Sequence, residues 1–120
     1  MYDIIFYEDR KGNEPIKDYI KELEQKASFN KDAKINFNKI VAYINQLKKH
    51  GSRLGEPFIK HIDNGIWELR PLDNRILYAY YKDNCYILLH HFIKTTKKLP
   101  LSELEQAKRN LANYKERNDK

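Results

Sequence analysis

The chain has 120 residues, of which 41% are hydrophobic, and 23 lysines and arginines outnumber 17 aspartates and glutamates to give a net charge of +6. This composition is typical of one folded domain, residues 1–120, and excludes a disordered or collagen-like chain. The single cysteine, Cys85, excludes an internal disulfide framework, so we expect a reducing, cytoplasmic setting. The chain starts without the basic and apolar pattern of a signal peptide, and we expect no membrane contact.

The first half of the sequence predicts one strand followed by two helices. Residues 2–7 form a short apolar run rich in β-forming residues, which predicts a strand. In residues 15–27, and again in 33–47, apolar side chains recur every three or four positions, the spacing of one helical face. The basic residues 48–50 and Gly51 are typical of a helix end. The short break between the helices predicts an antiparallel hairpin that needs another surface to cover it.

The second half predicts a meander of strands and a final helix. Strand-like runs are separated by turn residues, with Asn-Gly at 64–65 as the strongest hairpin signal. The expected strands are residues 58–62, 66–71, 75–81 and 86–93. We therefore expect an α+β fold in the order β-α-α-β-β-β-β-α, with an antiparallel sheet, an N-terminal helical hairpin and a C-terminal helix.

The last helix is expected to open near Pro100. Ser102 and Glu105 have the spacing of a capping box, in which each side chain binds a free backbone N–H of the first turn. Its apolar stripe ends at Tyr114, which we interpret as a core residue.

One segment near the end of the meander carries charge of a single sign. Residues 84–102 contain no acid, but they include Lys94, Lys97, Lys98 and two histidines. Such a segment suits a polyanion, because cations that neutralise phosphates release condensed counterions. The alternative is a solvated basic loop.

Strand alternation brings two arginines toward this segment. Side chains two residues apart share a face, so Arg70 lies opposite Trp67 and Leu69, and Arg75 lies opposite Ile76. The two guanidinium groups then approach each other across a tight connection and suit bidentate phosphate binding. Surface ion pairs are the alternative, with Glu68 or Asp73 as partner of Arg70 and Asp73 as partner of Arg75.

Several blocks of the sequence resemble one known family in the same order. They are Gly-Ile-Trp-Glu-Leu-Arg at 65–70, Arg-Ile-Leu-Tyr at 75–78, Leu-Leu-His-His-Phe-Ile-Lys-Thr-Thr-Lys-Lys-Leu-Pro at 88–100, and residues 103–107. Together they are similar to the HigB branch of the RelE/ParE toxin superfamily, and the resemblance spans nearly the whole chain. Four positions depart from the usual pattern: Asn74, His91, Thr95 and Leu99.

The resemblance implies a RelE-like fold and a toxin of a type II toxin–antitoxin system. Such a toxin is a ribosome-dependent endoribonuclease that cuts mRNA without a metal or other cofactor, and a HigA-like helix-turn-helix antitoxin neutralises it. Two other functions stay open, a non-catalytic poison of DNA gyrase of the ParE kind and an RNA-binding module without turnover. The basic segment with Arg70 and Arg75 favours RNA cleavage.

The resemblance also suggests roles for the cations. Arg70 and Arg75 would stabilise the phosphate, Lys94 and Lys98 would balance transition-state charge and are candidates for proton transfer, and Lys97 would bind the RNA backbone. Lys60, His61 and Lys82 are further expected RNA contacts.

The two histidines at 90–91 point to opposite faces of one strand, so at most one reaches the basic surface. His90 is the acid–base candidate, because imidazole titrates near neutral pH, although a structural role is the alternative. We expect no zinc site, because no further cysteine or close pair of carboxylates completes a ligand set. RelE-like members often carry a tyrosine at the start of the last helix, and residues 101–113 contain none.

Overall fold

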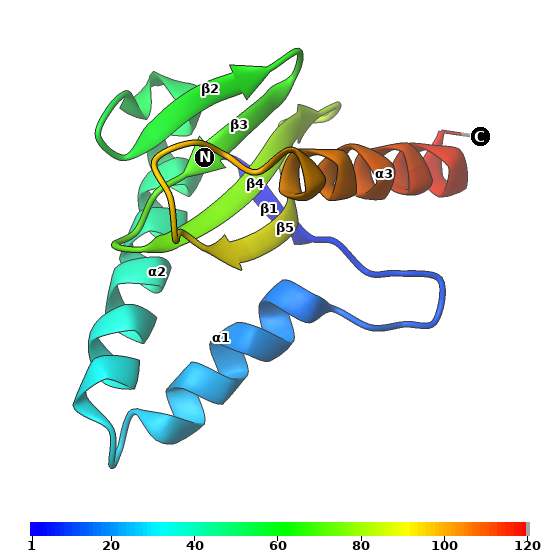
Figure 1. The fold of residues 1–120 in the computed structure, drawn as a ribbon. Helices are drawn as coiled ribbons and strands as arrows, with labels where there is room; N and C mark the ends of the chain where they lie inside the picture. The colour runs from blue at the N-terminus through cyan, green and yellow to red at the C-terminus, as the bar shows by residue number, and fades with distance from the viewer. Residues whose placement is uncertain (120) are drawn as a thin grey trace.

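A computed structural model describes residues 1–119, which form a five-stranded sheet with helices on both faces (Figure 1). The elements follow the predicted order, with one added 3-10 turn, so the α+β prediction is confirmed. They are β1 (Asp3–Phe6), α1 (Pro15–Lys26), α2 (Lys31–His50), η1 (Gly51–Leu54), β2 (Ile59–Asp63), β3 (Ile66–Leu69), β4 (Asn74–Tyr81), β5 (Cys85–Ile93) and α3 (Leu101–Asn118).

The sheet has the strand order β1-β5-β4-β3-β2. The predicted antiparallel meander is confirmed for β2 to β5, whereas β1 pairs with β5 in parallel, so the sheet as a whole is mixed. Parallel neighbours need a long crossover connection, and the whole segment from α1 through β4 connects β1 to β5. The alternation of apolar residues could not reveal this pairing, because it is the same for either direction.

Each face of the sheet has its own apolar core. On one face, Ile40 and Leu47 of α2 and Ile16 of α1 pack against alternate strand residues such as Leu69 and Tyr78. This is the surface that the helical hairpin was expected to need. On the other face, Ala107 of α3 packs in a smaller cluster with Tyr7, Ile66, Leu77, Ala79, Ile87 and Leu89.

Local signals explain where the elements begin and end. Asn30 caps α2 by accepting a hydrogen bond from the Ala33 N–H at 3.0 Å. The β2–β3 turn passes through Gly65 at φ 76°, a conformation that favours glycine. The predicted capping box of Ser102 and Glu105 is wrong, because α3 already begins at Leu101 and its cap position, Pro100, makes no side-chain cap bond. Ser102 therefore lies inside the first turn.

Across residues 1–119, none of the helices combines the length and the hydropathy that a membrane crossing requires.

Candidate active site

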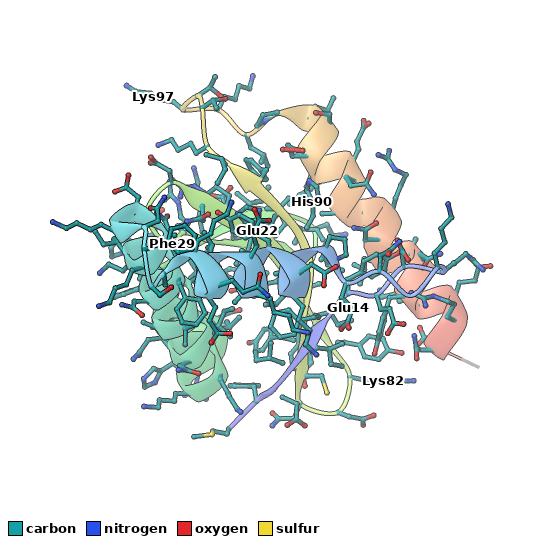
Figure 2. All side chains as sticks on the ribbon, turned by 90° about the horizontal axis from the view of Figure 1, so that it is seen from below. Glu14, Glu22, Phe29, Lys82, His90 and Lys97 are labelled. Atoms are coloured by element: carbon teal, nitrogen blue, oxygen red, sulfur yellow. The ribbon has the colours of Figure 1, made fainter. Side chains whose placement is uncertain are left out.

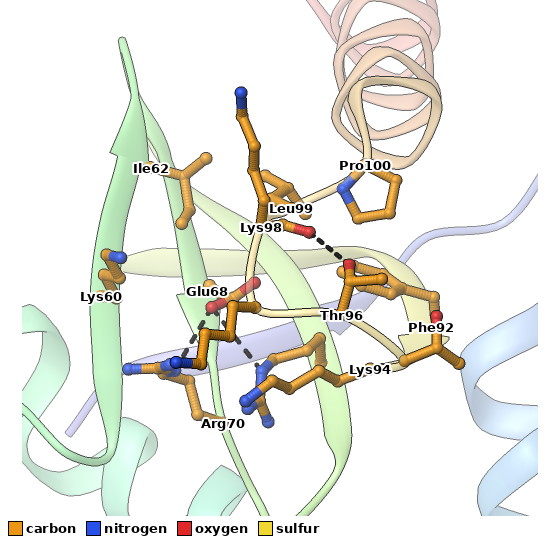
Figure 3. Close-up of a pocket in the computed structure, with 13 residues that line it drawn as sticks. Lys60, Ile62, Glu68, Arg70, Phe92, Lys94, Thr96, Lys98, Leu99 and Pro100 are labelled. Atoms are coloured by element: carbon orange, nitrogen blue, oxygen red, sulfur yellow. Dashed lines mark hydrogen bonds and ion pairs between the residues drawn. The ribbon is translucent and has the colours of Figure 1, made fainter.

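A small basic pocket lies at the end of the sheet that α3 leaves uncovered (Figure 3). The segment of residues 94–100, called here the basic loop, connects β5 to α3 and forms one wall. The opposite wall comes from β2, β3 and β4. The residues that line the pocket are Lys60, Ile62, Glu68, Arg70, Arg75, Phe92, Lys94, Thr95, Thr96, Lys97, Lys98, Leu99 and Pro100.

Strand register brings the polar residues of this pocket together. Glu68 is the partner of Leu77 across β3 and β4, and Arg75 is the partner of Phe92 across β4 and β5. Leu77 and Phe92 belong to the α3 face of the sheet, so Glu68 and Arg75 point to the same face. The expected approach of Arg70 and Arg75 is therefore present, with a carboxylate between them.

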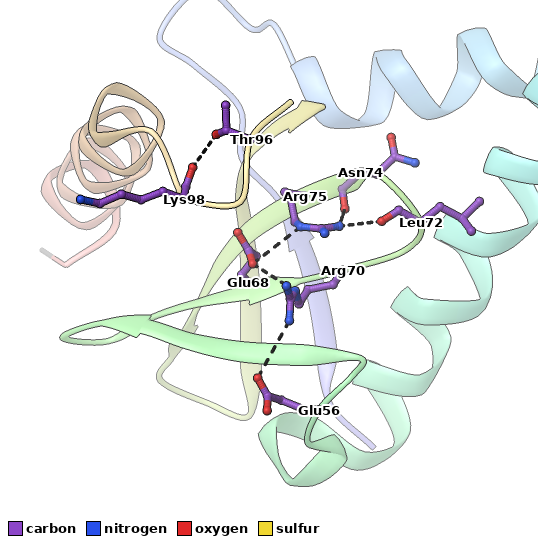
Figure 4. Close-up of polar contacts among 8 residues, drawn as sticks. All are labelled: Glu56, Glu68, Arg70, Leu72, Asn74, Arg75, Thr96 and Lys98. Carbon is purple, nitrogen blue, oxygen red and sulfur yellow. Dashed lines mark hydrogen bonds and ion pairs between the residues drawn. The ribbon is translucent and has the colours of Figure 1, made fainter. Parts of the chain in front are cut away.

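Glu68 bridges the two arginines through one oxygen (Figure 4). Its Oε1 lies 3.3 Å from Arg70 Nε and 3.8 Å from Arg75 Nε. Arg70 Nη1 also lies 3.9 Å from the exposed Glu56. The expected alternative of ion pairing is thus correct for Arg70 and Glu68, whereas the acid paired with Arg75 is Glu68 rather than Asp73.

Burial and nearby positive charge have opposite effects on the pKa of Glu68. Only 5% of the residue is exposed, and this desolvation raises its pKa above the usual glutamate range. Four cations oppose this rise in pKa. In order of decreasing effect they are Arg75, Arg70, Lys60 and Lys94. The carboxylate therefore lies in a strongly positive field but is poorly hydrated.

Arg75 is held rigidly by its own turn. Its Nη1 donates to the carbonyl oxygens of Leu72 at 2.7 Å and Asn74 at 2.8 Å, while burial leaves 6% of the residue exposed and lowers its pKa. Arg70 is more open, and its Nε is buried without a hydrogen-bond partner within residues 1–119. The pair combines a rigidly held guanidinium with a more exposed one.

A buried polar network on the opposite face of the sheet holds the turn that positions Arg75. Asn74 is fully buried, and its Oδ1 accepts from Tyr19 OH at 3.0 Å and from His91 Nε2 at 2.9 Å. Its amide donates to Asn36 Oδ1 at 2.8 Å and to the Pro71 carbonyl at 3.2 Å. Asn74 therefore connects α1, α2 and β5 to the turn before Arg75.

His91 belongs to this network and not to the pocket. Its ring stacks on Tyr19 with a centroid distance of 4.1 Å, and burial lowers its pKa to about 4. The neutral ring donates from Nε2 to Asn74, because Asn74 Oδ1 is an acceptor only. The prediction that the two histidines of β5 lie on opposite faces is confirmed.

The basic loop contributes lysines in different orientations. Lys94 is partly buried and its side chain runs toward the arginines (Figure 3), whereas Lys97 and Lys98 are exposed. Thr96 Oγ1 donates to the Lys98 carbonyl at 2.8 Å and closes the loop. The Lys98 side chain points away from Glu68 and Arg70 in both close-ups, so its ammonium lies at the rim.

Three of the expected site residues lie outside this pocket. His90 shares the pocket's face of the sheet, but its Nε2 lies 3.0 Å from Glu103 of α3. His61 packs edge-on against Trp67 at 4.9 Å, on the other face of the hairpin from Lys60. Lys82 pairs with Asp119 at 3.4 Å, and Figure 2 shows it far from Lys97.

Sequence reasoning missed three residues that shape the site. Glu68 was considered only as a surface ion-pair partner, although alternation with Arg70 already placed it on the same face. Phe92 packs against the apolar core of the α3 face, and it also forms a pocket wall. Asn74 carried no signal beyond its departure from the family pattern. Within residues 1–119, no group of three or more metal-ligating side chains is present.

The fold and the basic pocket define a class, a small α+β protein whose cations converge at one open end of a RelE-like sheet. The family of phage-derived Gp49-like proteins (DUF891) matches residues 18–112, and the chain belongs to this family. The match covers all pocket residues from Lys60 to Pro100. No curated protein matches the chain.

The Gp49-like family is a RelE/toxin-like family of toxin–antitoxin systems. The resemblance to the toxin superfamily is therefore confirmed at this level, and the family implies a toxin with an antitoxin partner. The HigB branch stays a prediction.

Proposed function

We propose that the protein is a HigB-type toxin that cleaves mRNA on the ribosome without a metal and is neutralised by a cognate HigA-like helix-turn-helix antitoxin. The observation that carries the proposal is the convergence of cations from β2, the β3–β4 turn region and the basic loop on one pocket. Lys60, Lys94, Lys97 and Lys98 have no acid within ion-pair distance among residues 1–119, so their charge is available to a phosphate.

The chemistry that suits such a pocket uses the RNA's own 2′-hydroxyl as nucleophile. Attack on the neighbouring phosphorus builds negative charge on the non-bridging oxygens, which preorganised guanidinium and ammonium groups stabilise. Arg75 supplies a rigidly held positive charge, Arg70 supplies a more open guanidinium at the pocket entrance, and Lys94 supplies a partly buried charge. The expected products are a 2′,3′-cyclic phosphate and a 5′-hydroxyl.

Dependence on the ribosome is supported by what the pocket lacks among its described lining. Phe92 is its one aromatic residue, and no asparagine or glutamine is present to read a base. The pocket offers phosphate contacts, which position RNA but carry little sequence information. Proper alignment of the 2′-hydroxyl with phosphorus would then come from mRNA already held in the decoding site.

The test is primer extension on a defined mRNA in purified translation reactions, with and without ribosomes. Codon-positioned cuts that require ribosomes are expected from the wild-type chain, and the Lys60→Ala/Lys94→Ala double variant should lose them. Lys82→Ala is the matched control, because it removes one lysine outside the pocket and should cut like wild type. A parallel assay with DNA gyrase covers the ParE-like alternative, and gyrase-dependent DNA breaks with intact mRNA would overturn the proposal.

A further inference from the structure

The pocket needs a group that accepts a proton if RNA is cleaved there. An ammonium or guanidinium group has no free lone pair at neutral pH, so the lysines and arginines cannot accept one in their charged forms. Among the described residues that line the pocket there is no histidine, tyrosine or cysteine, and Glu68 is the one carboxylate. His90, the acid–base residue expected from the sequence, is paired with Glu103 instead.

The two oxygens of Glu68 have different surroundings. Oε1 faces both arginines, at 3.3 Å from Arg70 Nε and 3.8 Å from Arg75 Nε. Oε2 makes no hydrogen bond or ion pair among residues 1–119. In Figures 3 and 4 the second oxygen points away from both arginines, toward the loop that carries Thr96 and Lys98. One oxygen therefore fixes the carboxylate, and the other faces the pocket.

A phosphate bound by the two arginines would lie beside this free oxygen. In a phosphodiester bound by Arg70 and Arg75, the 2′-hydroxyl is attached to the sugar carbon next to the one that carries the 3′-oxygen, so the nucleophile lies next to the phosphate. Burial strengthens the carboxylate as a proton acceptor, because desolvation raises the pKa of Glu68. The ion pairs with the arginines keep it anionic and oriented.

We propose that Glu68 is the general base of the reaction, a proposal that depends on the ribonuclease function proposed above. Glu68 Oε2 takes the proton of the 2′-hydroxyl as the 2′-oxygen forms its bond to phosphorus. The bond between phosphorus and the 5′-oxygen breaks, and its electron pair stays on the 5′-oxygen. This oxygen takes a proton from the Lys94 ammonium. Glu68 then loses its proton to water and Lys94 regains one, which restores the pocket.

The experiment compares Glu68→Gln with the unaltered chain in single-turnover cleavage of mRNA on programmed ribosomes, with saturating toxin, from pH 5 to pH 8. Glutamine keeps the shape of the side chain but accepts no proton, so the rate should fall about 100-fold or more. Binding to ribosomes should stay equal or become tighter, because one negative charge leaves a basic pocket. Glu56→Gln is the matched control, since it removes another acid next to Arg70 from outside the pocket lining and should change the rate less than about threefold.

The pH profile separates proton transfer from a structural role. The unaltered chain should show a rate that rises with pH while Glu68 loses its proton, and Glu68→Asp should keep this rise at a lower rate. Glu68→Gln should lose the rise. A profile of the unaltered chain without an acid limb overturns the proposal, and this measurement does not depend on the folding of any variant. Equal rates for Glu68→Gln and wild type also overturn it, while absence of cleavage by the wild type overturns the ribonuclease function itself.

Discussion

The two faces of the sheet differ in how completely their polar groups are paired. On the face covered by α1 and α2, Asn74 is fully buried and every polar atom of its side chain has a partner. On the face covered by α3, the helix begins at the edge of the pocket, directly after Pro100, and Arg70 Nε is buried without a hydrogen-bond partner among residues 1–119. A satisfied network stabilises a fold, whereas the pocket lysines, which have no acid within ion-pair distance among residues 1–119, are available to a ligand. The hairpin face thus holds the molecule together, and the pocket face is free to bind.

The largest expected effect comes from the fixed arginine of the pocket face. Arg75→Lys keeps the charge but loses the fork that contacts two carbonyl oxygens and approaches Glu68. The rate of mRNA cleavage on ribosomes should fall by about 10²–10³, the usual cost of one lost transition-state donor. Arg53→Lys, an exposed change on η1, is the control and should leave the rate unchanged. A rate for Arg75→Lys close to that of the control would show that this guanidinium has no role in catalysis.

The second-largest effect is expected on stability, from a change on the face covered by α1 and α2. Asn74→Ala removes the hydrogen-bond partner that Tyr19, Asn36 and His91 share at this buried position. Because unpaired buried polar groups are costly, we expect the free energy of unfolding in urea to drop by about 3 kcal/mol. Asn36→Ala removes only one of these contacts, from a more exposed position, and should cost about 1 kcal/mol. Equal stability of Asn74→Ala and wild type would contradict the account of the hairpin face.

The same network predicts a dependence of stability on pH. The pKa of His91 is 6.5 when unfolded and about 4 in the folded chain, so the unfolded state binds the proton more strongly. This contribution to stability is complete above pH 6.5 and is lost as pH falls toward 4, by up to about 3 kcal/mol. Thermal unfolding of His91→Gln from pH 7 to pH 4.5 should therefore depend less on pH than that of wild type. Parallel curves for the two chains would mean that His91 does not couple to folding.

The smallest effect is expected from Lys94, a pocket residue that should affect RNA cleavage but not stability. Lys94→Ala should slow cleavage about tenfold to a hundredfold and lower the salt dependence of RNA binding by about one phosphate contact. Its free energy of unfolding should change by less than about 0.5 kcal/mol, because Lys94 has no ion-pair partner within the described chain. Lys82→Ala is again the control. A large loss of stability without a loss of rate would assign Lys94 to the fold rather than to the pocket.

The sequence predicted the elements better than the contacts between them. Periodicity was sufficient for α1 and α2, and the Asp-Asn-Gly turn for the β2–β3 hairpin, because these signals are local. The acid that pairs with Arg75 depends on the register of β3 against β4, which joins residues that are not local. A bulge gives a clear example. Leu77 pairs with His90 and Tyr78 with Leu88, so Leu89 has no partner and the alternation along β5 changes face.

The candidate site was predictable to the extent that it depends on charge. Lys60, Arg70, Arg75, Lys94, Lys97 and Lys98 were all expected, and all of them line the pocket. His61 failed to reach it because strand alternation turns it toward Trp67, and Lys82 because its turn lies at the far end of the sheet. The role of Asn74 was not predictable, since its partners come from three other elements.

The most direct test of the central claim, that this pocket directs the RNA's own hydroxyl against its phosphate, is a single 2′-deoxy substitution at the cleaved position of a ribosome-bound mRNA. Removing that hydroxyl should abolish cleavage at the substituted position, while an adjacent deoxy substitution leaves cleavage intact and the unmodified product carries a 2′,3′-cyclic phosphate. Cleavage of the deoxy-substituted mRNA at the normal rate would contradict the mechanism.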